Sequence, residues 1–344
     1  MVTVSDMLAI LDTGDARPRR LAGPRLDGVR ASPDTEVAPG LVMSVGPDRY
    51  RIVGGLPGVL YPALIPKTPL RGPVRVHAGL HKCLTMLSRR VYEATVGPVG
   101  RPRLERWGLA HRPFKHCFHY LRRFHRELAH DRRRILSISG HRLDLDGMGD
   151  ARVVRIIRDP RDLIVSGLHY HRRGTEPWSR TRSPKRGDFD EVNGGIPSGL
   201  LPGQTMQEFV TDADLPTAMR AELEFRRPHL QSMMAWDPSD RRVLTLRYED
   251  ILGHEVAAFE RIARHFELSE AEVAAARLGA AEFALGGAKA QTGHVRNPKP
   301  RQWRDHFDHD LHDAFLSEFG PLLDAYGYPR NAEEGVPDAS RPAV

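Results

Sequence analysis

Hydrophobic positions along this chain alternate between short apolar runs and longer amphipathic stretches. From Val74 onward, runs rich in β-branched residues are followed by a polar turn and then by apolar residues three or four positions apart. This alternation predicts strands that are each followed by a helix, and hence an α/β fold with a mostly parallel sheet and helices on both faces. We expect strands at 74–76, 135–139, 153–157 and 243–246, and helices at 86–92, 114–132, 163–170, 206–235 and 255–266.

Segments without this periodicity mark the expected domain organisation. Residues 16–47 are rich in Pro, Gly, Arg and Asp and are expected to be irregular, whereas residues 50–65 suit a short hairpin or another cover on the core. Residues 175–203 are long and irregular, which in a compact domain is typical of a substrate loop or lid. We expect an irregular N-terminal extension packed on the core at 1–70, one α/β domain at 71–330 with the loop or lid at 175–203, and a flexible tail at 331–344.

The composition is that of a globular protein. Hydrophobic residues make up 40% of the 344 positions, which is enough for a sizeable core. No apolar run approaches the ~18 residues that a membrane-spanning helix needs, and the first residues carry acids where a secretion signal has a basic region. The only cysteines, Cys83 and Cys117, provide no disulfide framework. These features predict a cytoplasmic protein without a membrane span.

The charge of the chain favours an anionic ligand. The formal net charge is +7, with local basic excesses at 122–134 and 171–187. A positive cleft raises the encounter rate with an anionic nucleotide, and a basic stripe also occurs in nucleic-acid-binding proteins. Because aromatic residues make up only 7% of the chain, stacking platforms are scarce. We therefore favour a nucleotide and expect no specific nucleic-acid partner.

The most informative segment is a strand, a polar turn and a helix at 151–173. The strand ends at Arg158, and Asp159 and Pro160 then suit the cap and the first turn of a helix. Ser166 follows about two helical turns after Arg158. A guanidinium at the carboxyl end of a strand, together with a hydroxyl, suits a phosphate group, because arginine offers a fixed fork of donors.

A second loop between a strand and a helix lies at 79–85. Such a loop presents free backbone N–H groups and the positive end of the helix dipole, which together attract anions. Lys82 adds a mobile cation and Thr85 adds a hydroxyl. The chain contains no Gly-x-x-x-x-Gly-Lys-Ser/Thr sequence, so this loop is not the phosphate loop of a common ATPase or GTPase.

These two segments resemble sulfotransferases that use 3′-phosphoadenosine 5′-phosphosulfate (PAPS). In that family, a strand ending in Arg-x-Pro-x-Asp, with a Ser two helical turns later, holds the 3′-phosphate, as Arg158 and Ser166 would here. The family's loop for the 5′-phosphosulfate is commonly Lys-Ser-Gly-Thr-Thr-Trp. Leu84 places a Cβ where the family has a bare glycine backbone. The matching positions are Lys82, Cys83, Leu84, Thr85, Met86 and Leu87.

Two later segments match the same family in the same order. Arg296 corresponds to an arginine that contacts the 3′-phosphate in the family, and Trp303 and Phe307 follow it as expected packing residues. Tyr248, in a Tyr-Glu-Asp sequence after a strand, and Phe283 correspond to aromatic residues near adenine. For both of these, core packing and adenine contact remain open. The four matches together cover about two thirds of the chain.

The resemblance implies a fold, a reaction and a set of roles. The fold is a three-layer sandwich like that of P-loop NTPases, and the reaction moves a sulfuryl group from PAPS to a hydroxyl of a small-molecule, lipid or glycan acceptor. The products are a sulfate ester and 3′-phosphoadenosine 5′-phosphate (PAP), and no metal is implied. Lys82 would act on the leaving oxygen. His141, which follows the strand at 135–139, would be the general base, with His81 as the reserve candidate.

Alternative interpretations remain open at this stage. A P-loop-like kinase would need Mg²⁺ ligands and a tighter glycine loop. A non-catalytic polyanion-binding protein would show salt-sensitive affinity without preference for a 3′-phosphate. The sequence leaves the oligomeric state open, and a homodimer is allowed.

Overall fold

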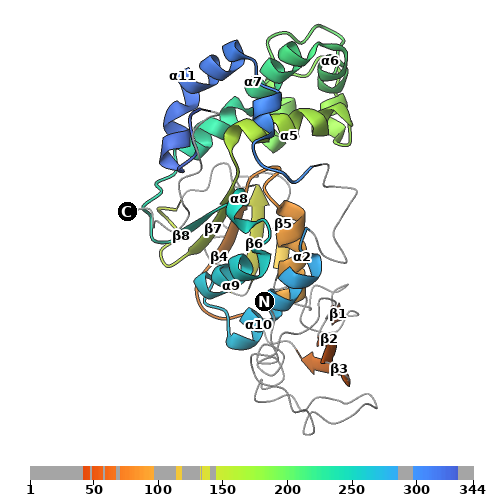
Figure 1. Cartoon of the computed structure of the whole chain (residues 1–344), viewed down its shortest axis with the longest axis vertical. Coiled ribbons are helices and arrows are strands. Elements are labelled where there is room, and N and C mark those ends of the chain that lie inside the picture. Colours follow the sequence, from red (N-terminus) through yellow and green to blue (C-terminus); the bar gives the residue numbers. More distant parts are fainter. Residues whose placement is uncertain are drawn as a thin grey trace.

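A five-stranded parallel sheet forms the centre of the fold (Figure 1). In this computed structural model, residues 42–46, 49–56, 59–66, 70–96, 114–117, 132, 134–139, 145–285 and 297–331 are described. The strand order is β5-β6-β4-β7-β8, and every neighbouring pair is parallel. The strands are β4 (Arg75–Gly79), β5 (Phe114–Cys117), β6 (Ile135–Ser139), β7 (Arg152–Ile157) and β8 (Val243–Arg247).

The sheet is buried on both faces, as parallel sheets usually are. On β7, Val154 and Ile156 pack into the main core, whereas Val153 belongs to a second apolar cluster that includes Val76 and Leu136. Helices α2, α9 and α10 contribute to the main core, and α10 lies against both α2 and α9. Their bounds are α2 (Thr85–Val96), α9 (Glu255–His265) and α10 (Glu270–Phe283). The α/β class predicted from the alternating pattern is confirmed.

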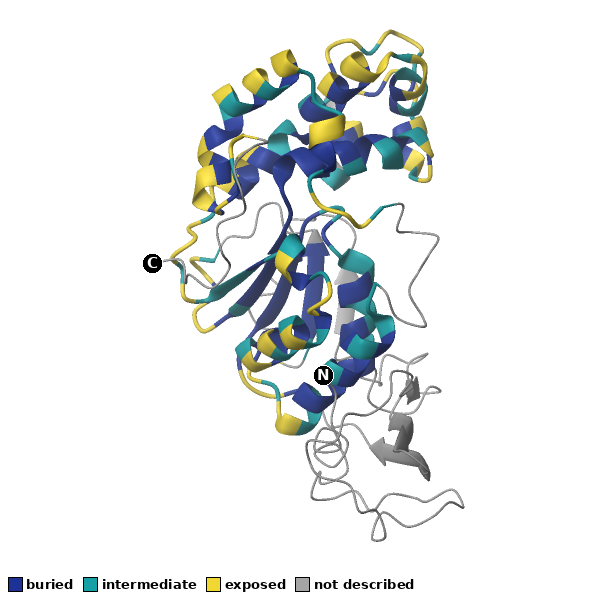
Figure 2. Ribbon diagram, viewed as in Figure 1, coloured by how far each residue is buried: buried dark blue, intermediate teal, exposed yellow. Residues whose placement is uncertain are grey.

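A group of helices lies beyond the carboxyl ends of the strands (Figure 1). Helix α5 follows β7 directly and packs against α6 and α7, and α7 packs against α11. Their inward turns are buried and many outward turns are exposed (Figure 2). The bounds are α5 (Pro160–Arg172), α6 (Met206–Asp212), α7 (Leu215–Met234) and α11 (His309–Ala325). The helices predicted at 163–170, 206–235 and 255–266 are therefore present.

The prediction of a helix at 114–132 is wrong at its start. Residues Phe114–Cys117 form strand β5, which pairs with β6 through Phe114 and Ile135. The apolar spacing that suggested a helix is overridden by parallel pairing at the edge of the sheet, because strand preference depends on the neighbouring strand more than on local sequence. Residues 118–131 lie outside the described part of the chain.

The N-terminal region contains a separate antiparallel sheet. Strands β2 (Arg49–Leu56) and β3 (Val59–Pro66) form the hairpin expected around residues 50–65. A third strand, β1 (Val42–Gly46), pairs with β2 inside a segment that we expected to be irregular. Strand β1 lies close to α2 and α10. Antiparallel pairing with β2 explains β1, whose local composition alone does not predict a strand.

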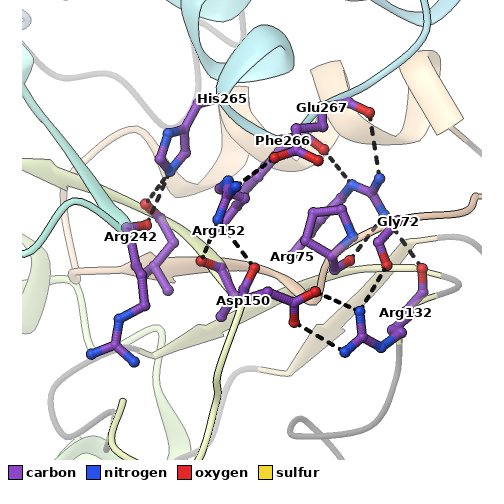
Figure 3. A network of polar contacts seen from close by, with 12 residues as sticks. Gly72, Arg75, Arg132, Asp150, Arg152, Arg242, His265, Phe266 and Glu267 are labelled. Carbon is purple, nitrogen blue, oxygen red and sulfur yellow. Dashed lines mark hydrogen bonds and ion pairs between the residues drawn. The ribbon is translucent and has the colours of Figure 1, made fainter.

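Charged side chains at the amino ends of the strands form a satisfied network (Figure 3). The buried guanidinium of Arg75 donates only to backbone carbonyls, including that of Phe266 at 2.5 Å. Arg132 pairs with Asp150 at 2.6 Å. Arg152 pairs with Glu267 at 2.5 Å. Because each of these three guanidiniums already has partners, the described residues of this network hold the edge of the sheet together.

Candidate active site

Two polar turns meet at the carboxyl edge of the sheet. Strands β4 and β7 are parallel neighbours, with Val76 opposite Val153. The loop after β4 spans residues 80–84, and the turn after β7 contains Arg158 and Asp159. Because carboxyl ends of adjacent parallel strands lie at the same edge, the two predicted phosphate-binding turns lie side by side, where α/β folds bind ligands.

The loop after β4 has a backbone shaped to receive an anion. Lys82 has φ of 68° and Leu84 has φ of 56°, both in the left-handed region. The backbone N–H groups of Leu84 and of the first turn of α2 donate to no carbonyl of the described residues. Such a concave run of free N–H groups at a helix start favours negative charge. Leu84 thus adopts the conformation that glycine prefers, at a cost of about 1–2 kcal/mol.

Lys82 is a cation among other cations. Its ammonium lies over the ring of Tyr170, at 4.3 Å from the ring centre, and forms no ion pair with the described residues. Burial, together with the positive charges of Arg226, Arg158 and Arg173, lowers the pKa of Lys82 to about 8. An anion bound here would offset this repulsion and favour the charged form of the lysine.

The other side chains of the loop are buried, partly buried or bonded to the loop backbone. The Cys83 thiol is buried, and burial raises its pKa to about 12, so it stays protonated and unreactive. The Thr85 hydroxyl donates to the Leu80 carbonyl at 3.4 Å. Met86 is half-buried, and Leu87 is buried in the main core. Of the aligned loop residues, Lys82 is therefore the one whose side chain supplies a positive charge.

Arg158 is the second cation of the site, and two of its nitrogens make no hydrogen bond to the described residues. Its side chain is buried and stacks on the ring of Tyr248 at 4.4 Å from the ring centre. An ion pair joins its Nη2 to Asp162 Oδ2 at 3.5 Å. Its Nε and Nη2 make no hydrogen bond to any described residue. Because buried donors are nearly always satisfied, these orphaned nitrogens fit an anionic group such as a phosphate.

The turn around Arg158 is rigidly held. Asp159 caps α5 by accepting from the Arg161 N–H at 3.0 Å, as the sequence predicted. Glu249 accepts from the Asp159 N–H at 3.0 Å. Burial raises the pKa of Glu249 to about 7. Asp162 accepts from the backbone N–H groups of Arg301 at 2.7 Å and Trp303 at 3.0 Å, which ties the segment after residue 296 to this turn.

One face of α5 connects the two cations. Asp162, Ser166 and Tyr170 are four residues apart and therefore share a face of the helix. Asp162 contacts Arg158 and Tyr170 contacts Lys82. Ser166 is half-buried between them on that face, which is the position expected of a hydroxyl near the phosphates.

The remaining predicted residues have mixed outcomes. The hydroxyl of Tyr248 donates to the Pro298 carbonyl at 2.9 Å, and Arg158 covers one face of its ring. Phe283 packs against the edge of the main core, with Arg90 over its ring at 5.4 Å. Trp303 is buried, with its ring centre 6.3 Å from that of Phe307, which confirms their packing role. His141 and Arg296 lie outside the described residues.

Two aromatic residues of the expected substrate loop are buried anchors. The ring of Trp178 stacks on Phe225 of α7 at 5.1 Å, and Phe189 lies 5.2 Å from Trp178. Both side chains are buried in the main core. They attach the segment 175–203 to the helical group and are not exposed to an acceptor.

A buried polar chain beside Lys82 was not predicted from the sequence. Glu222 on α7 accepts from His171 Nδ1 at 2.6 Å and from Arg226 Nε at 2.9 Å. The Nη2 of Arg226 then donates to Nδ1 of His81 at 2.8 Å. The spacing of Glu222 and Arg226 on one helix face was the available signal, but their partners come from distant elements. We call these four residues the His81 relay.

Gly167 leaves the space in which the His81 relay forms. A Cβ at this position would lie 2.0 Å from Glu222 Oε1 and 2.8 Å from Arg226 Nη2. We expect Gly167→Ala to lower the free energy of unfolding by about 1–3 kcal/mol, because the buried pair must move. Gly147→Ala is the matched control, since nothing lies within 4 Å of its Cβ position. Denaturant titrations of both variants check this, and equal stabilities would contradict the close contact.

Comparison with known proteins agrees with this site. The model of the sulfotransferase domain family matches residues 117–327, which is more than half of the chain. The chain has an α/β fold with two polar turns at one edge of a parallel sheet, and it belongs to the sulfotransferase domain family.

Several solved structures resemble the chain. Mouse sulfotransferase SULT7A1 complexed with PAP has 15% identity and a TM-score of 0.43, covering 74% of this chain and 85% of that one. Retinol dehydratase in complex with androsterone and inactive cofactor PAP has 16% identity and a TM-score of 0.32, covering 80% and 90%. A sulfotransferase from Alicyclobacillus acidocaldarius has 11% identity and a TM-score of 0.34, covering 74% and 94%. No curated protein matches the chain.

Neither a helix suited to span a membrane nor a cluster of metal-binding side chains occurs in the described part of the chain. Within it, no helix combines the length and apolar character needed to cross a bilayer. Across the same residues, no group of three or more His, Cys, Asp or Glu side chains is arranged to hold a metal ion.

Proposed function

We propose that this enzyme transfers the sulfuryl group of PAPS to a hydroxyl of a small-molecule, lipid or glycan acceptor, giving a sulfate ester and PAP. The observation that carries the proposal is the pair of buried Arg158 nitrogens that make no hydrogen bond to the described residues, beside the cationic Lys82 loop on the neighbouring strand. Two cationic turns at one edge suit a ligand with phosphates at both ends. PAPS supplies the sulfuryl group, whose S–O bond to the 5′-phosphate breaks as the bond to the acceptor oxygen forms.

Lys82 is proposed to stabilise the leaving phosphate oxygen. Negative charge develops on that oxygen as the sulfuryl group departs, and a fixed cation in a desolvated site stabilises it more than water does. The free N–H groups at the start of α2 support the same charge. Cys83, Leu84, Thr85 and Met86 contribute through the backbone of this loop.

Arg158, Ser166 and Arg296 are proposed to hold the 3′-phosphate. The support for Arg158 is its buried guanidinium with two free donors, and that for Ser166 is its place between Asp162 and Tyr170 on α5. Tyr248 and Phe283 are proposed to lie near the adenine, where a stacked ring contributes roughly 1–3 kcal/mol. Because Tyr248 already supports Arg158 with one face, only its other face would meet the base.

His141 is proposed as the general base that accepts the proton of the acceptor hydroxyl. It follows β6, whose carboxyl end lies beside that of β4. His81 is less suited to this role, because its Nδ1 already accepts from Arg226. Burial and the nearby charge of Arg226 also lower the pKa of His81 well below its usual range.

The domain boundaries of the sequence analysis are retained as a proposal. Residues 71–330 would form the sulfotransferase domain, residues 1–70 an extension on it, and 175–203 the acceptor loop. The exposed cations Arg180, Arg182 and Lys185 in that loop would favour acceptors that carry negative charge.

The affinity for PAP should depend on pH through Lys82. In the free enzyme the pKa of Lys82 is about 8, so the lysine is a cation below that pH and becomes neutral above it. We expect PAP affinity to fall as pH rises from about 8 to about 10, because the neutral amine attracts phosphate weakly. Cys83 and Tyr248, with pKa values of about 12, do not titrate in this window.

Isothermal titration of PAP across this pH range measures the effect, with Lys82→Arg as the control. Arginine stays charged, so the variant should bind PAP with little change over the same range. An equally steep decline in Lys82→Arg would assign the pH dependence to another group.

A comparison of nucleotides tests the proposed function. Thermal unfolding is measured with PAP, AMP and ATP, each with and without Mg²⁺, because a ligand that binds the fold raises its stability. PAP is expected to raise the midpoint most, without a need for Mg²⁺. A larger effect of ATP with Mg²⁺ would favour a kinase.

Labelled PAPS and a panel of hydroxyl acceptors, with the products analysed by mass spectrometry, identify the acceptor. In the same assay, His141→Ala should slow sulfuryl transfer by at least ~10²-fold.

A further inference from the structure

We propose that His81 donates a hydrogen bond from its Nε2–H to the phosphosulfate group of the donor, and that Arg226, Glu222 and His171 are the positioning residues that hold it in this form. The proposal rests on the proposed function, because it places the phosphosulfate in the loop after β4. It adds to that loop a side-chain donor that none of the sequence motifs indicates.

The hydrogen bond from Arg226 determines which nitrogen of His81 carries the proton. A guanidinium can only donate, so Nδ1 of His81 must accept in the contact of 2.8 Å. A neutral imidazole with an accepting Nδ1 carries its proton on Nε2. His81 is thus held as an Nε2–H donor, in the same way that a second hydrogen bond fixes the form of a metal-binding histidine.

The rest of the His81 relay keeps Arg226 in place. Glu222 accepts from Arg226 Nε at 2.9 Å, and its other oxygen accepts from His171 Nδ1 at 2.6 Å. All three side chains are buried. The ring of His171 also stacks on that of His81, with centres 6.2 Å apart and an interplanar angle of 15°. The Glu222 carboxylate therefore accepts hydrogen bonds from both residues that face His81, Arg226 on α7 and His171 on α5.

The position of His81 makes the donor useful to the phosphosulfate. It directly precedes Lys82, and both residues contact the ring of Tyr170, with His81 at 5.0 Å between ring centres. Its Nε2 makes no hydrogen bond with the described residues. Donors aimed at a site of developing negative charge, in a place from which water is excluded, are the largest contribution to many transfer reactions.

His81 stays neutral in this site because it is buried among positively charged side chains. Protonation of His81 is opposed by burial and by its positively charged neighbours, so its pKa lies well below the usual range. A second lysine or arginine here would add repulsion to Lys82, whereas a neutral Nε2–H adds a donor without adding charge. The groups that face His81 are Arg226, Lys82, His171, His229, Tyr170 and, through Arg226, Glu222.

The ¹⁵N chemical shifts of the histidine rings, measured by NMR on the full-length wild-type enzyme, test the proposal. This test does not require an active variant. The spectrum of ¹⁵N-histidine protein is recorded from about pH 5.5 to about pH 8, with His81→Gln used to assign the resonance. We expect His81 as the Nε2–H form throughout and a shift of Nε2 on addition of PAP. In Arg226→Gln the guanidinium no longer fixes Nδ1 as the acceptor, so the ring should populate both neutral tautomers. A wild-type ring that is cationic, or protonated on Nδ1, would overturn the proposal.

Kinetics separate a donor from a packing residue. His81→Leu should lower kcat for sulfuryl transfer by roughly 10²-fold, as loss of one such donor does elsewhere. His81→Gln should recover part of that loss, because its amide N–H can take the place of Nε2–H. His309→Leu, at an exposed position on α11, is the matched control and should leave kcat unchanged. Unchanged kcat in a folded His81→Leu, or equal losses for Leu and Gln, would contradict the role.

Failure of this inference differs from failure of the proposed function. If wild-type enzyme binds PAP more tightly than AMP but His81→Leu keeps full activity, only the role of His81 is wrong. If the wild-type enzyme does not distinguish PAP from AMP, the assignment of the whole site fails. Circular dichroism melts of each variant show whether the fold is intact before the kinetic values are compared.

Discussion

Replacing Lys82 with alanine is expected to lower kcat for sulfuryl transfer by about 10³- to 10⁵-fold, the range found when the cation that stabilises a transferring phosphoryl group is removed. The physical reason is the position of its ammonium in a half-buried loop, over Tyr170 and without an acidic partner among the described residues. The leaving oxygen carries little charge in bound PAPS, where its bond to sulfur is intact, and gains charge in the transition state as that bond breaks. PAPS affinity should therefore fall less, by about 10- to 100-fold, the value of one charge-assisted hydrogen bond.

Single-turnover assays with labelled PAPS measure the rate, and the dependence of that rate on PAPS concentration measures PAPS affinity. Arg89→Ala is the matched control, because Arg89 is a cation on the first turns of α2 that pairs with Glu93 at 2.9 Å. That exposed pair is worth little, so both quantities should be nearly unchanged. If Lys82→Ala weakens PAPS binding but leaves kcat unchanged, Lys82 binds the ground state and does not stabilise the leaving oxygen.

Replacing Arg158 with alanine is expected to weaken PAP binding roughly 10²- to 10⁴-fold, the combined value of two charge-assisted hydrogen bonds. The donors concerned are the two buried nitrogens, Nε and Nη2, that make no hydrogen bond to the described residues. Adenosine 5′-phosphosulfate, which lacks the 3′-phosphate, should lose far less affinity. The fold should persist, because Asp162 keeps its hydrogen bonds from the backbone of Arg301 and Trp303.

The contrast between the two ligands is the decisive measurement, made by calorimetry or by competition. Arg152→Ala is the matched control, since it removes a positive charge at the other end of the same strand, where Arg152 pairs with Glu267 at 2.5 Å. Binding of both ligands to that variant should be unchanged. Equal losses for PAP and adenosine 5′-phosphosulfate in Arg158→Ala would refute the assignment of the 3′-phosphate to Arg158.

The two strand–turn–helix segments were predictable from the sequence because their signals are local. Alternating periodicity predicted β7 and α5, and Asp159 and Pro160 marked the start of the helix. The sheet could then be assumed parallel, which brings Arg158 and Lys82 to one edge. The family motifs added the ligand that the two cations are expected to bind, and this role stays a prediction.

Features that depend on contacts between distant residues could not be predicted. Strand β5 is specified by pairing with β6, and its own sequence did not show it. Trp178 lies in the segment expected to be a substrate loop, but the rings of Phe225 and Phe189 bury it. The contact between Arg226 and His81 joins residues 145 positions apart. A single sequence has no local pattern for such pairs.

The paired charges at the amino edge of the sheet affect the rate at which a nucleotide reaches the enzyme. There, Arg132 and Arg152 are balanced by Asp150 and Glu267, so that rim projects little potential into solvent (Figure 3). At the opposite rim, Lys82 and Arg173 lack acidic partners among the residues described. Among the described residues, the unbalanced charge therefore lies at the rim of Lys82 and Arg173, which should attract a diffusing anionic nucleotide. The rate of capture should decline as added salt shortens the reach of that field.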